Sequence, residues 1–339
     1  MKILVDAFGG DHSPDQVIIG ALDALKEEQG FTVVLVGDKQ IIEQQLADKK
    51  YDCSRVEIIH APDVITCEEE PTLAVRRKPE SSICVAFKHL KEDDQMSAFV
   101  SAGSTGAVLV GATLRLGRIS GVNRPALCPV IPTMIEGKEV YLMDSGANAD
   151  CKPINLCQFA LMASAYAEAT GVKNPKVALL SNGTEDEKGN MLNHEVFPIL
   201  KKMKTINFVG NIEGRDILTG DYDVVVTDGF AGNVALKTME GTVNTIFSVL
   251  KSEIYSTFKG KLGGLLLKKT FKKIKGRMDY NNKGGALFLG VGKTVIKAHG
   301  ASKSLAIKNA VLQAVKYSES NVSERVKERI QAEPIPLGE

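Results

Sequence analysis

The sequence predicts an α/β fold with a mostly parallel β-sheet, and two observations support this prediction. Short runs of β-branched and apolar residues lead into glycine-rich loops, and helical patterns of apolar residues follow these loops. The same order recurs along the chain, and such alternation of strands and helices is typical of a parallel sheet.

Five of the predicted strands end in a loop that contains glycine. The strands and their loops are 2–6 with 8–14, 98–101 with 102–106, 140–144 with 145–148, 177–180 with 181–190, and 223–226 with 227–233. In an open parallel sheet, the ligand crevice lies beyond the carboxyl ends of the strands. We therefore expect these five loops to gather at one edge of the sheet.

The loop at 227–233 has the composition of an anion site. The free amides at the start of the following helix, and the positive end of its dipole, favour a bound anion. Gly229 and Gly232 would let the backbone approach the ligand closely, and Asn233 adds a neutral side-chain donor. Several such amide-rich loops around one cleft would suit a phosphate.

The remaining elements continue the alternation of strands and helices. Ser13 and Ser302 are placed to cap helices, and the proline-rich residues 123–132 suit an edge strand or a loop. The charged residues 66–80 indicate a solvated face, or a contact of the basic residues 76–78 with phosphate or an acidic partner. We predict strands at 31–36, 55–60, 206–209 and 294–297, helices at 14–28, 39–46, 104–117, 153–170, 191–203 and 303–317, a turn at 210–216 and a frayed tail from 331.

Residues 240–280 predict a protruding helical hairpin. Apolar residues step by three and four from 243 to 262, as in one long helix, and Gly263-Gly264 then interrupts the pattern. Seven lysines and no acidic residue lie between 259 and 275. A helix that is both basic and apolar binds to an anionic membrane surface. Alternatively, the apolar faces close a homodimer while the lysines stay in water, and the two arrangements are compatible.

The composition predicts one large α/β domain over residues 1–339, or two subdomains that share a sheet, because 339 residues with 44% hydrophobic side chains can bury a large core. The 42 basic and 41 acidic residues give a net charge of +1. This balance argues against bulk electrostatic binding to nucleic acid and leaves room for a local basic patch.

The cysteine and histidine patterns predict neither disulfides nor a metal site. The six cysteines include no C-x-x-C pair, and neither they nor the five histidines show metal-ligand spacing. The chain enters a predicted strand at once, and no apolar run approaches the ~20 residues needed to span a bilayer. We expect a cytoplasmic protein with reduced thiols.

Two nucleotide-binding motifs are excluded. Residues 290–294 (Gly-Val-Gly-Lys-Thr) lack the glycine that a phosphate-binding P-loop needs five positions before its Gly-Lys pair, where Leu287 stands. No G-x-G-x-x-G sequence follows a predicted strand, so the nicotinamide fingerprint is also missing.

Lys188 is the one lysine within the five glycine-rich loops. It could supply a point charge to phosphate or to a developing oxyanion, or it could balance the acidic residues at 185–187. No arrangement of Ser, Cys and His identifies a covalent nucleophile, and G-x-S-x-G is missing. In an acyl transfer the nucleophile would therefore be a substrate oxygen, and catalysis would come from positioning and charge stabilisation.

Six strings occur in order over nearly the whole chain, and together they resemble the bacterial acyl-acyl-carrier-protein:phosphate acyltransferases. Phe8 and Ser104 stand where this family more often has Met and Asn. The strings are 6–11 (DAFGGD), 101–107 (SAGSTGA), 146–153 (GANADCKP), 181–184 with 188–190, 227–233 with 236–238 and 240–241, and 296–300 (IKAHG).

The resemblance implies that inorganic phosphate attacks the thioester of a long-chain acyl carrier protein, which gives acyl phosphate for phospholipid synthesis and the free carrier thiol. It also implies a three-layer α/β/α sandwich like that of isocitrate dehydrogenases and phosphotransacetylases, a homodimer, no metal or cofactor, and peripheral attachment to the inner face of the cell membrane. The hairpin would then present Leu262, Leu266 and Phe271 to the membrane. Basic clusters near the cleft would meet the acidic carrier protein.

The same resemblance implies that Lys188 and Asn233 are catalytic and stabilise the tetrahedral oxyanion. The substrate- and phosphate-binding residues that we predict come from the five glycine-rich loops, except for Asp144, which ends the strand before one of them. They are Gly9, Gly10, Asp11, His12, Gly103, Ser104, Thr105, Gly106, Asp144, Asn148, Asn182, Gly183, Asp228 and Gly229.

Two other functions stay open on the sequence. A short-chain acyl-CoA:phosphate acyltransferase would share the chemistry but would need no membrane hairpin. A membrane scaffold with a relict cleft would bind lipid without catalysing a reaction. A dehydrogenase of the same fold is disfavoured because the nicotinamide fingerprint is missing.

Overall fold

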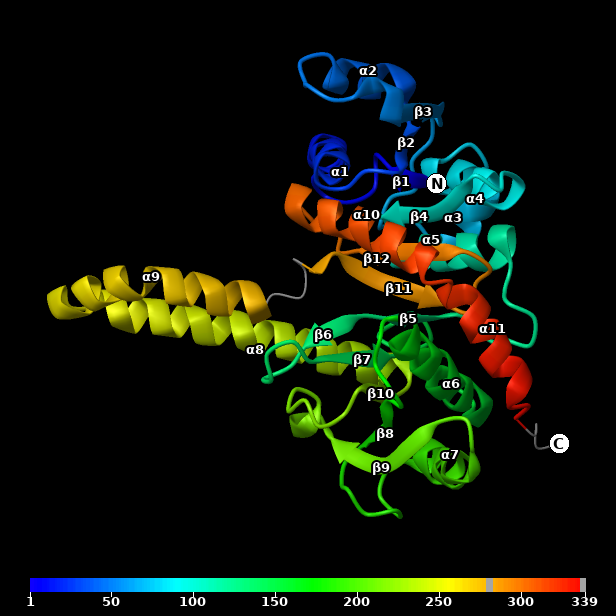
Figure 1. The fold of residues 1–339 in the computed structure, drawn as a ribbon, viewed down its shortest axis with the longest axis vertical. Helices are drawn as coiled ribbons and strands as arrows, with labels where there is room; N and C mark the ends of the chain where they lie inside the picture. The colour runs from blue at the N-terminus through cyan, green and yellow to red at the C-terminus, as the bar shows by residue number, and fades with distance from the viewer. Residues whose placement is uncertain (279–282, 336–339) are drawn as a thin grey trace.

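The computed structural model describes residues 1–278 and 283–335, and in this part of the chain the strands form two sheets (Figure 1). The larger sheet has the order β3-β2-β1-β4-β12-β11-β5, and the smaller has the order β6-β7-β10-β8-β9. The strands are β1 (Lys2–Asp6), β2 (Thr32–Gly37), β3 (Val56–His60), β4 (Met96–Ser101), β5 (Ala126–Cys128), β6 (Val130–Pro132), β7 (Glu139–Met143), β8 (Lys176–Ser181), β9 (Asn207–Glu213), β10 (Val224–Val226), β11 (Gly285–Leu289) and β12 (Thr294–Ala298).

Both sheets are mostly parallel, as predicted. In the larger sheet β1, β2, β3, β4 and β12 pair in parallel, and β11 is antiparallel to both of its neighbours. In the smaller sheet only β6 is antiparallel. The α/β class is confirmed, but the single sheet edge predicted for the five loops is wrong. The loops after β1 and β4 leave the larger sheet, and those after β7, β8 and β10 leave the smaller one.

Helices cover both faces of the sheets. Because successive strand residues point to opposite faces, Ile3 and Val5 lie in one core while Leu4 lies in another. The helices are α1 (Asp15–Glu27), α2 (Lys39–Leu46), α3 (Pro71–Arg77), α4 (Ser82–Glu92), α5 (Thr105–Gly111), α6 (Pro153–Ala169), α7 (Met191–Lys202), α8 (Gly229–Tyr255), α9 (Phe258–Met278), α10 (Ser304–Glu319) and α11 (Val322–Ala332).

The cores give the chain its three layers. Helices α1, α6 and α10 pack on one face of both sheets and form one continuous core. Helices α4 and α5 cover the opposite face of the larger sheet. The start of α8, through Leu236, covers the opposite face of the smaller sheet. This shared core holds the two sheets together.

Residues 126–132 join the two sheets. β5 is the edge strand of the larger sheet and β6 is the edge strand of the smaller one, with Pro129 between them. The Pro129 carbonyl accepts a hydrogen bond from Leu142 N at 3.2 Å, and the Leu127 carbonyl accepts one from Ser145 N at 3.1 Å. Proline has no N–H to donate and therefore suits a sheet edge. The prediction of an edge strand here is confirmed.

Two predicted helix caps are wrong. Ser13 Oγ donates to the Gly10 carbonyl at 2.8 Å, and Pro14 occupies the N-cap of α1. Helix α10 begins two residues after Ser302, with Lys303 at its N-cap. In both loops the serine lies too early in the turn to reach the amides of the first helical turn.

Other elements extend the predicted pattern. The turn expected at 210–216 is mostly strand, because Gly210, at a φ of 105°, sits at a register shift within β9 and is not the end of the strand. Helix α3 lies within the charged residues 66–80. Strand β11 and helix α11 were not predicted, and α11 extends past residue 331, where we expected a frayed tail. Residues 336–339 lie outside the described part.

Helices α8 and α9 form the predicted hairpin, which projects from the body (Figure 1). The break lies at residues 256–257 and not at Gly263-Gly264. A Cβ on Gly264 would lie 2.8 Å from Ile254 Cγ2, and one on Gly260 would lie 2.1 Å from the Ile254 carbonyl oxygen. The glycines of α9 therefore allow close packing on α8, and the helix continues through them. Residues 279 and 280 of the predicted hairpin lie outside the described residues.

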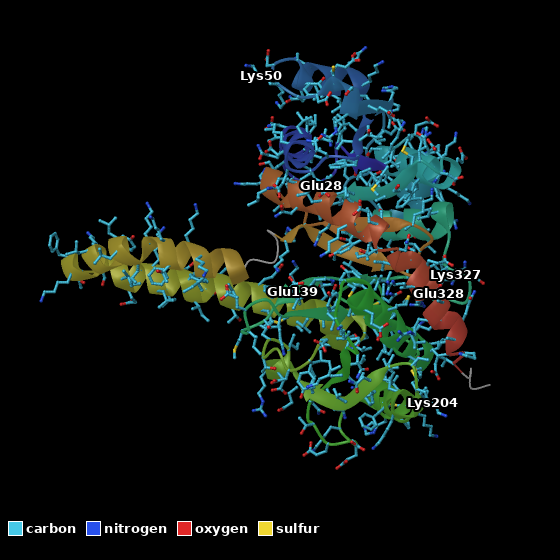
Figure 2. The ribbon with its side chains drawn as sticks, in the orientation of Figure 1. Glu28, Lys50, Glu139, Lys204, Lys327 and Glu328 are labelled. Atoms are coloured by element: carbon cyan, nitrogen blue, oxygen red, sulfur yellow. The ribbon has the colours of Figure 1, made fainter. Side chains whose placement is uncertain are left out.

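The hairpin carries exposed apolar and basic side chains along its length (Figure 2). Lys283, which follows α9 in the described chain, forms an ion pair with Glu139 of β7, labelled in Figure 2 where the hairpin meets the body. Among the described residues, no helix has the length and hydropathy needed to cross a membrane.

Candidate functional site

The buried carboxylate of Asp144 organises the loop after β7. Its Oδ1 accepts hydrogen bonds from Leu127 N at 3.0 Å and Ala147 N at 3.1 Å. Its Oδ2 accepts from Asn148 N at 2.7 Å and Asn148 Nδ2 at 2.9 Å. Burial raises the pKa of Asp144, whereas these four N–H groups lower it by favouring the carboxylate. Asp144 and Asn148 are both buried, so in this structure they shape the loop from within.

The first turn of α8 packs directly on this loop. A Cβ on Gly232 would lie 1.9 Å from the Asp144 carbonyl oxygen, and one on Gly229 would lie 2.6 Å from the Asn148 carbonyl oxygen. No other residue type permits this approach without a backbone shift. The two glycines therefore let α8 pack closely on the Asp144 loop. From the sequence, we expected them to leave room for a ligand.

Two amides at the start of α8 are already hydrogen-bonded within the protein. Gly229 N donates to the Asn148 carbonyl at 2.8 Å, and Ala231 N donates to Asp228 Oδ1 at 2.8 Å, so Asp228 is the N-cap of the helix. The prediction of free amides at this loop is wrong for both groups. These two amides are therefore not free to bind an anion.

A cleft of about 350 Å³ lies where loops of the two sheets meet. Asn233, Leu236 and Lys237 line it from α8, and residues 297–300 line it from the end of β12. Thr105 contributes from the start of α5, and Ser145 and Gly146 contribute from the loop after β7. The packing of α8 on the Asp144 loop thus places Asn233 in the wall of a cleft that both sheets form.

Lys297 is a lysine within the buried strand β12, and only 8% of it is exposed. Its Nζ donates to the Ala102 carbonyl at 3.3 Å and to the Ala298 carbonyl. Burial lowers the pKa of Lys297 to about 8, with Asp6 acting in the opposite direction. A lysine with this pKa is mostly protonated at neutral pH and loses its proton at mildly basic pH, and an anion placed beside it would favour the protonated form.

His299 and Lys237 lie beside each other in the same cleft. His299 Nε2 is 3.3 Å from Lys237 Nζ, and His299 Nδ1 accepts a hydrogen bond from Ala301 N at 3.2 Å. Burial, followed by the positive charge of Lys237, lowers the pKa of His299. Lys237 also forms an ion pair with Glu240 at 2.7 Å. Three basic groups from two elements therefore converge on one cleft.

A second hollow of about 440 Å³ lies on the other side of the first turn of α8. Its lining includes Asn182 and Asn190 from the loop after β8, and Asp228 and Ala231 from α8. Thus residues 228 and 231 face this hollow, whereas residues 233, 236 and 237 face the cleft.

Lys188 is exposed in the loop after β8, and its stem lies over Gly183, where an added Cβ would be 2.7 Å from Lys188 Cγ. Asp186, one of its acidic neighbours, forms an ion pair with Lys201 at 2.6 Å. No ion pair joins Lys188 to any residue of the described chain. This arrangement weighs against the interpretation that Lys188 only balances the acids at 185–187.

The loops after β1 and β4 pack against each other and against the end of β12. Asp11 N donates to the Gly300 carbonyl at 2.9 Å, and an added Cβ on Gly9 would lie 2.7 Å from Gly103 N. Ser104 caps α5, and an added Cβ on Gly106 would lie 2.5 Å from Pro71 Cγ. Gly10 packs on Ala102, and His12 is exposed. Of the predicted residues in these two loops, Thr105 lines the cleft.

Four of the predicted site residues line one of these two hollows. Asn233 and Thr105 line the cleft, whereas Asn182 and Asp228 line the second hollow. Lys237, Lys297 and His299 were not among the predicted site residues, although IKAHG was one of the matching strings. The signal that could have found Lys297 is a charged residue in the middle of a short strand that is otherwise apolar. Within residues 1–278 and 283–335, no group of three His, Cys, Asp or Glu side chains could hold a metal ion.

Comparisons with known proteins identify close relatives of the chain. A family model described as a fatty acid synthesis protein matches residues 1–325. The phosphate acyltransferase of Clostridium novyi is 48% identical over 338 residues, which cover 99% of this chain and 100% of the relative. That of Bacillus cereus is 47% identical over 92% of this chain and 93% of the relative.

Solved structures share the fold. A phosphotransacetylase from Streptococcus pyogenes superposes with a TM-score of 0.61 at 15% identity, and the match covers 95% of this chain and 94% of that one. A branched-chain phosphotransacylase from Enterococcus faecalis superposes with a TM-score of 0.59 at 14% identity, covering 94% and 99%. These likenesses confirm the α/β/α sandwich.

The contact between α8 and the Asp144 loop can be tested with two substitutions in one helix. Gly232→Ala should destabilise the protein by about 2 kcal/mol or more, because its methyl group would overlap the Asp144 carbonyl. Gly241→Ala, where no atom lies within 4 Å of the added Cβ, should stabilise the helix by about 0.5 to 1 kcal/mol. Urea unfolding followed by circular dichroism measures both. Equal effects of the two substitutions would contradict the contact.

Proposed function

The chain belongs to the phosphate acyltransferase family, and we propose that this acyltransferase moves a long-chain fatty acyl group from acyl carrier protein to inorganic phosphate. A phosphate oxygen attacks the thioester carbonyl carbon, and the C–S bond breaks. The proton carried by the attacking phosphate ends on the carrier sulfur. The products are the free carrier thiol and acyl phosphate, which phospholipid synthesis would consume.

The observation that carries this proposal is the composition of the cleft between the sheets. Asn233 lies there beside three basic side chains, in a cleft that also has apolar lining from Leu127, Pro129 and Leu236. Basic groups suit an anionic nucleophile, and the apolar lining suits the acyl end of a thioester. We assign Asn233 as a donor to the oxyanion that forms at the carbonyl oxygen.

Lys188 supplies positive charge to the same intermediate from the loop after β8. It is exposed and has no ion-pair partner among the described residues, so its charge is available to a substrate. The loop lies beside the first turn of α8, whose other side carries Asn233. The assignment of Lys188 therefore rests on its available charge and on the family resemblance, and it requires the carbonyl oxygen to be reached from both sides of that turn.

The reaction that we propose has no covalent enzyme intermediate. Burial raises the pKa of Cys151 to about 11 and that of Cys157 to about 12, and it raises the pKa of Cys128 well above its usual range. A thiol with such a pKa is a poor nucleophile, because the thiolate is the reactive form. Direct attack by phosphate, which is already an anion, needs no such group.

We propose that the enzyme is a homodimer bound peripherally to the inner face of the cell membrane through the hairpin. Leu262 is 58% exposed and Leu266 79%, and the lysines of α9 accompany them. Phe271, the third predicted membrane residue, is only partly exposed. Exposed Ile246 and Val249 of α8 offer an apolar surface to a second copy. Basic groups near the cleft support docking of the acidic carrier protein.

The experiment that tests the reaction follows the fate of the acyl group. Purified protein is incubated with palmitoyl acyl carrier protein and phosphate, and the product is trapped with hydroxylamine. Acyl hydroxamate formation that requires phosphate supports the proposal. A preference for acetyl-CoA over the carrier substrate would favour the short-chain acyl-CoA enzyme, and no product with either substrate would favour a non-catalytic scaffold.

Removal of either oxyanion donor should lower turnover. We expect Lys188→Ala and Asn233→Ala each to lower kcat by ~100- to 1,000-fold, because each removes a donor that acts mainly in the transition state. Carrier thiol release measures the effect. Lys173→Ala and Asn244→Ala, both at exposed positions, are the matched controls and should keep wild-type rates. Near wild-type turnover of both site variants in a folded protein would overturn these assignments.

Membrane binding should depend on the apolar side chains of α9. We expect Leu262→Glu with Leu266→Glu to weaken binding to phosphatidylglycerol vesicles by ~100-fold or more, because each buried leucine is worth about 1.5 to 3 kcal/mol. Asn244→Glu with Ser252→Glu makes the same change in charge on exposed polar positions of α8 and should bind nearly as well as wild type. Co-sedimentation with the vesicles measures the binding of both variants. An equal loss of binding in the two variants would show that the added negative charge causes the effect, and not the loss of apolar side chains.

A further inference from the structure

We propose that the attacking phosphate binds in the cleft between the sheets, and that Lys237, Lys297 and His299 form its site. This inference rests on the proposed function, and it specifies which residues hold the nucleophile. The sequence suggested the loops at 227–233 and 181–184 for this role. The amides of Gly229 and Ala231 are already hydrogen-bonded within the protein, and the basic cluster offers donors that face the cleft.

Two hydrogen-bond donors, on His299 and Lys237, face each other in the cleft. His299 Nδ1 accepts a hydrogen bond from Ala301 N, so a neutral imidazole carries its proton on Nε2. Lys237 Nζ, also a donor, lies 3.3 Å from that nitrogen. Two donors that face each other need a common acceptor, and a phosphate oxygen between or beside them would accept from both.

Lys297 is buried in the wall of the same cleft. Burying a charged group is costly unless it is paired, and the Lys297 Nζ contacts named above are to the backbone carbonyls of Ala102 and Ala298. Burial lowers the pKa of Lys297 to about 8. An anion beside this amine would favour its protonated form, so that phosphate and lysine stabilise each other.

Carboxylates lie around the three basic groups, Lys237, Lys297 and His299. The carboxylates that act on these groups are Glu240, which forms an ion pair with Lys237, and Asp6 and Asp11 on the side of Lys297. Asp6 is buried, and it accepts a hydrogen bond from Ser101 Oγ at 2.7 Å. Burial raises the pKa of Asp6, which favours its neutral form. Glu240 and Asp11 offset part of the positive charge, and Lys237 and Lys297 still line the cleft with N–H donors.

The position of the cluster relative to Asn233 fits the reaction. Asn233 and Lys237 are four residues apart on α8, so they lie on the same face of the helix one turn apart. A phosphate held at Lys237 is thus one helical turn from the group that we assign to the oxyanion. The attacking oxygen and the thioester carbonyl would meet between them.

A phosphate group could reach this cleft as free phosphate or as the phosphodiester of the carrier's prosthetic arm. The depth of Lys297 favours the free ion, because a buried lysine suits a small ion that the cleft can enclose. Kinetics separate the two sources. A site for free phosphate sets the KM for phosphate, whereas a site for the arm sets the KM for the acyl carrier protein.

The test compares Lys237→Met and Lys297→Met with Lys293→Met. Lys293 is a matched control, because its Nζ also donates to two backbone carbonyls, those of Asp93 and Met96, but it does not line the cleft. We expect the two cleft variants to raise the KM for phosphate about tenfold or more and to leave the KM for acyl carrier protein within about twofold. Lys293→Met should change neither.

Calorimetric titration with inorganic phosphate, without any thioester, tests the site apart from the reaction. Wild type and Lys293→Met should bind phosphate saturably, and the cleft variants should lose that binding. If Lys297→Met fails to fold, Lys237→Met still tests the site, because Lys237 is exposed. Wild-type phosphate binding in Lys237→Met, or an increased KM for the carrier protein alone, would overturn the site. Saturable phosphate binding without phosphate-dependent turnover would instead reject the proposed function and leave the site standing.

Discussion

The contact between the first turn of α8 and the Asp144 loop is the constraint on which the rest of the structure depends. Gly232 meets the Asp144 backbone at a distance that excludes any side chain, and Asp144 in turn holds its loop through four N–H donors. This contact fixes the direction in which α8 leaves the smaller sheet. The helix then divides the two hollows, places Asn233 and Lys237 in the cleft, and continues outward as one arm of the hairpin.

The charge of this protein is distributed unevenly. The chain is nearly neutral overall, at +1, yet one group of basic side chains lines the cleft and another lies along α9. The first set suits a small anion, and the second suits an anionic surface. The same long helix links the two sets. Under the proposed function, α8 connects the cleft of the acyl transfer to the hairpin that we propose as the membrane contact.

Much of the fold followed from the sequence, because strand and helix patterns are local. The strands that end in glycine loops and the helix at 39–46 were predicted nearly to the residue. The division into two sheets was not, since pairing between distant strands leaves no local pattern. Glycine was the other source of error. Gly229 and Gly232 let α8 pack on the Asp144 loop, Gly264 lets α9 contact α8, and Gly210 lies at a bulge in β9. Lys297 was missed as a site residue because its burial is a property of the assembled sheet.

The central claim is that phosphate attacks the thioester directly within the cleft. A single-turnover experiment with enzyme in excess over palmitoyl acyl carrier protein tests it most directly, with carrier thiol measured in the absence and presence of phosphate. Direct attack predicts no thiol release without phosphate and complete release once phosphate is added. A stoichiometric burst of thiol without phosphate would show an acyl-enzyme and contradict the account. The exposed thiol of Cys67 would then be the first nucleophile to examine.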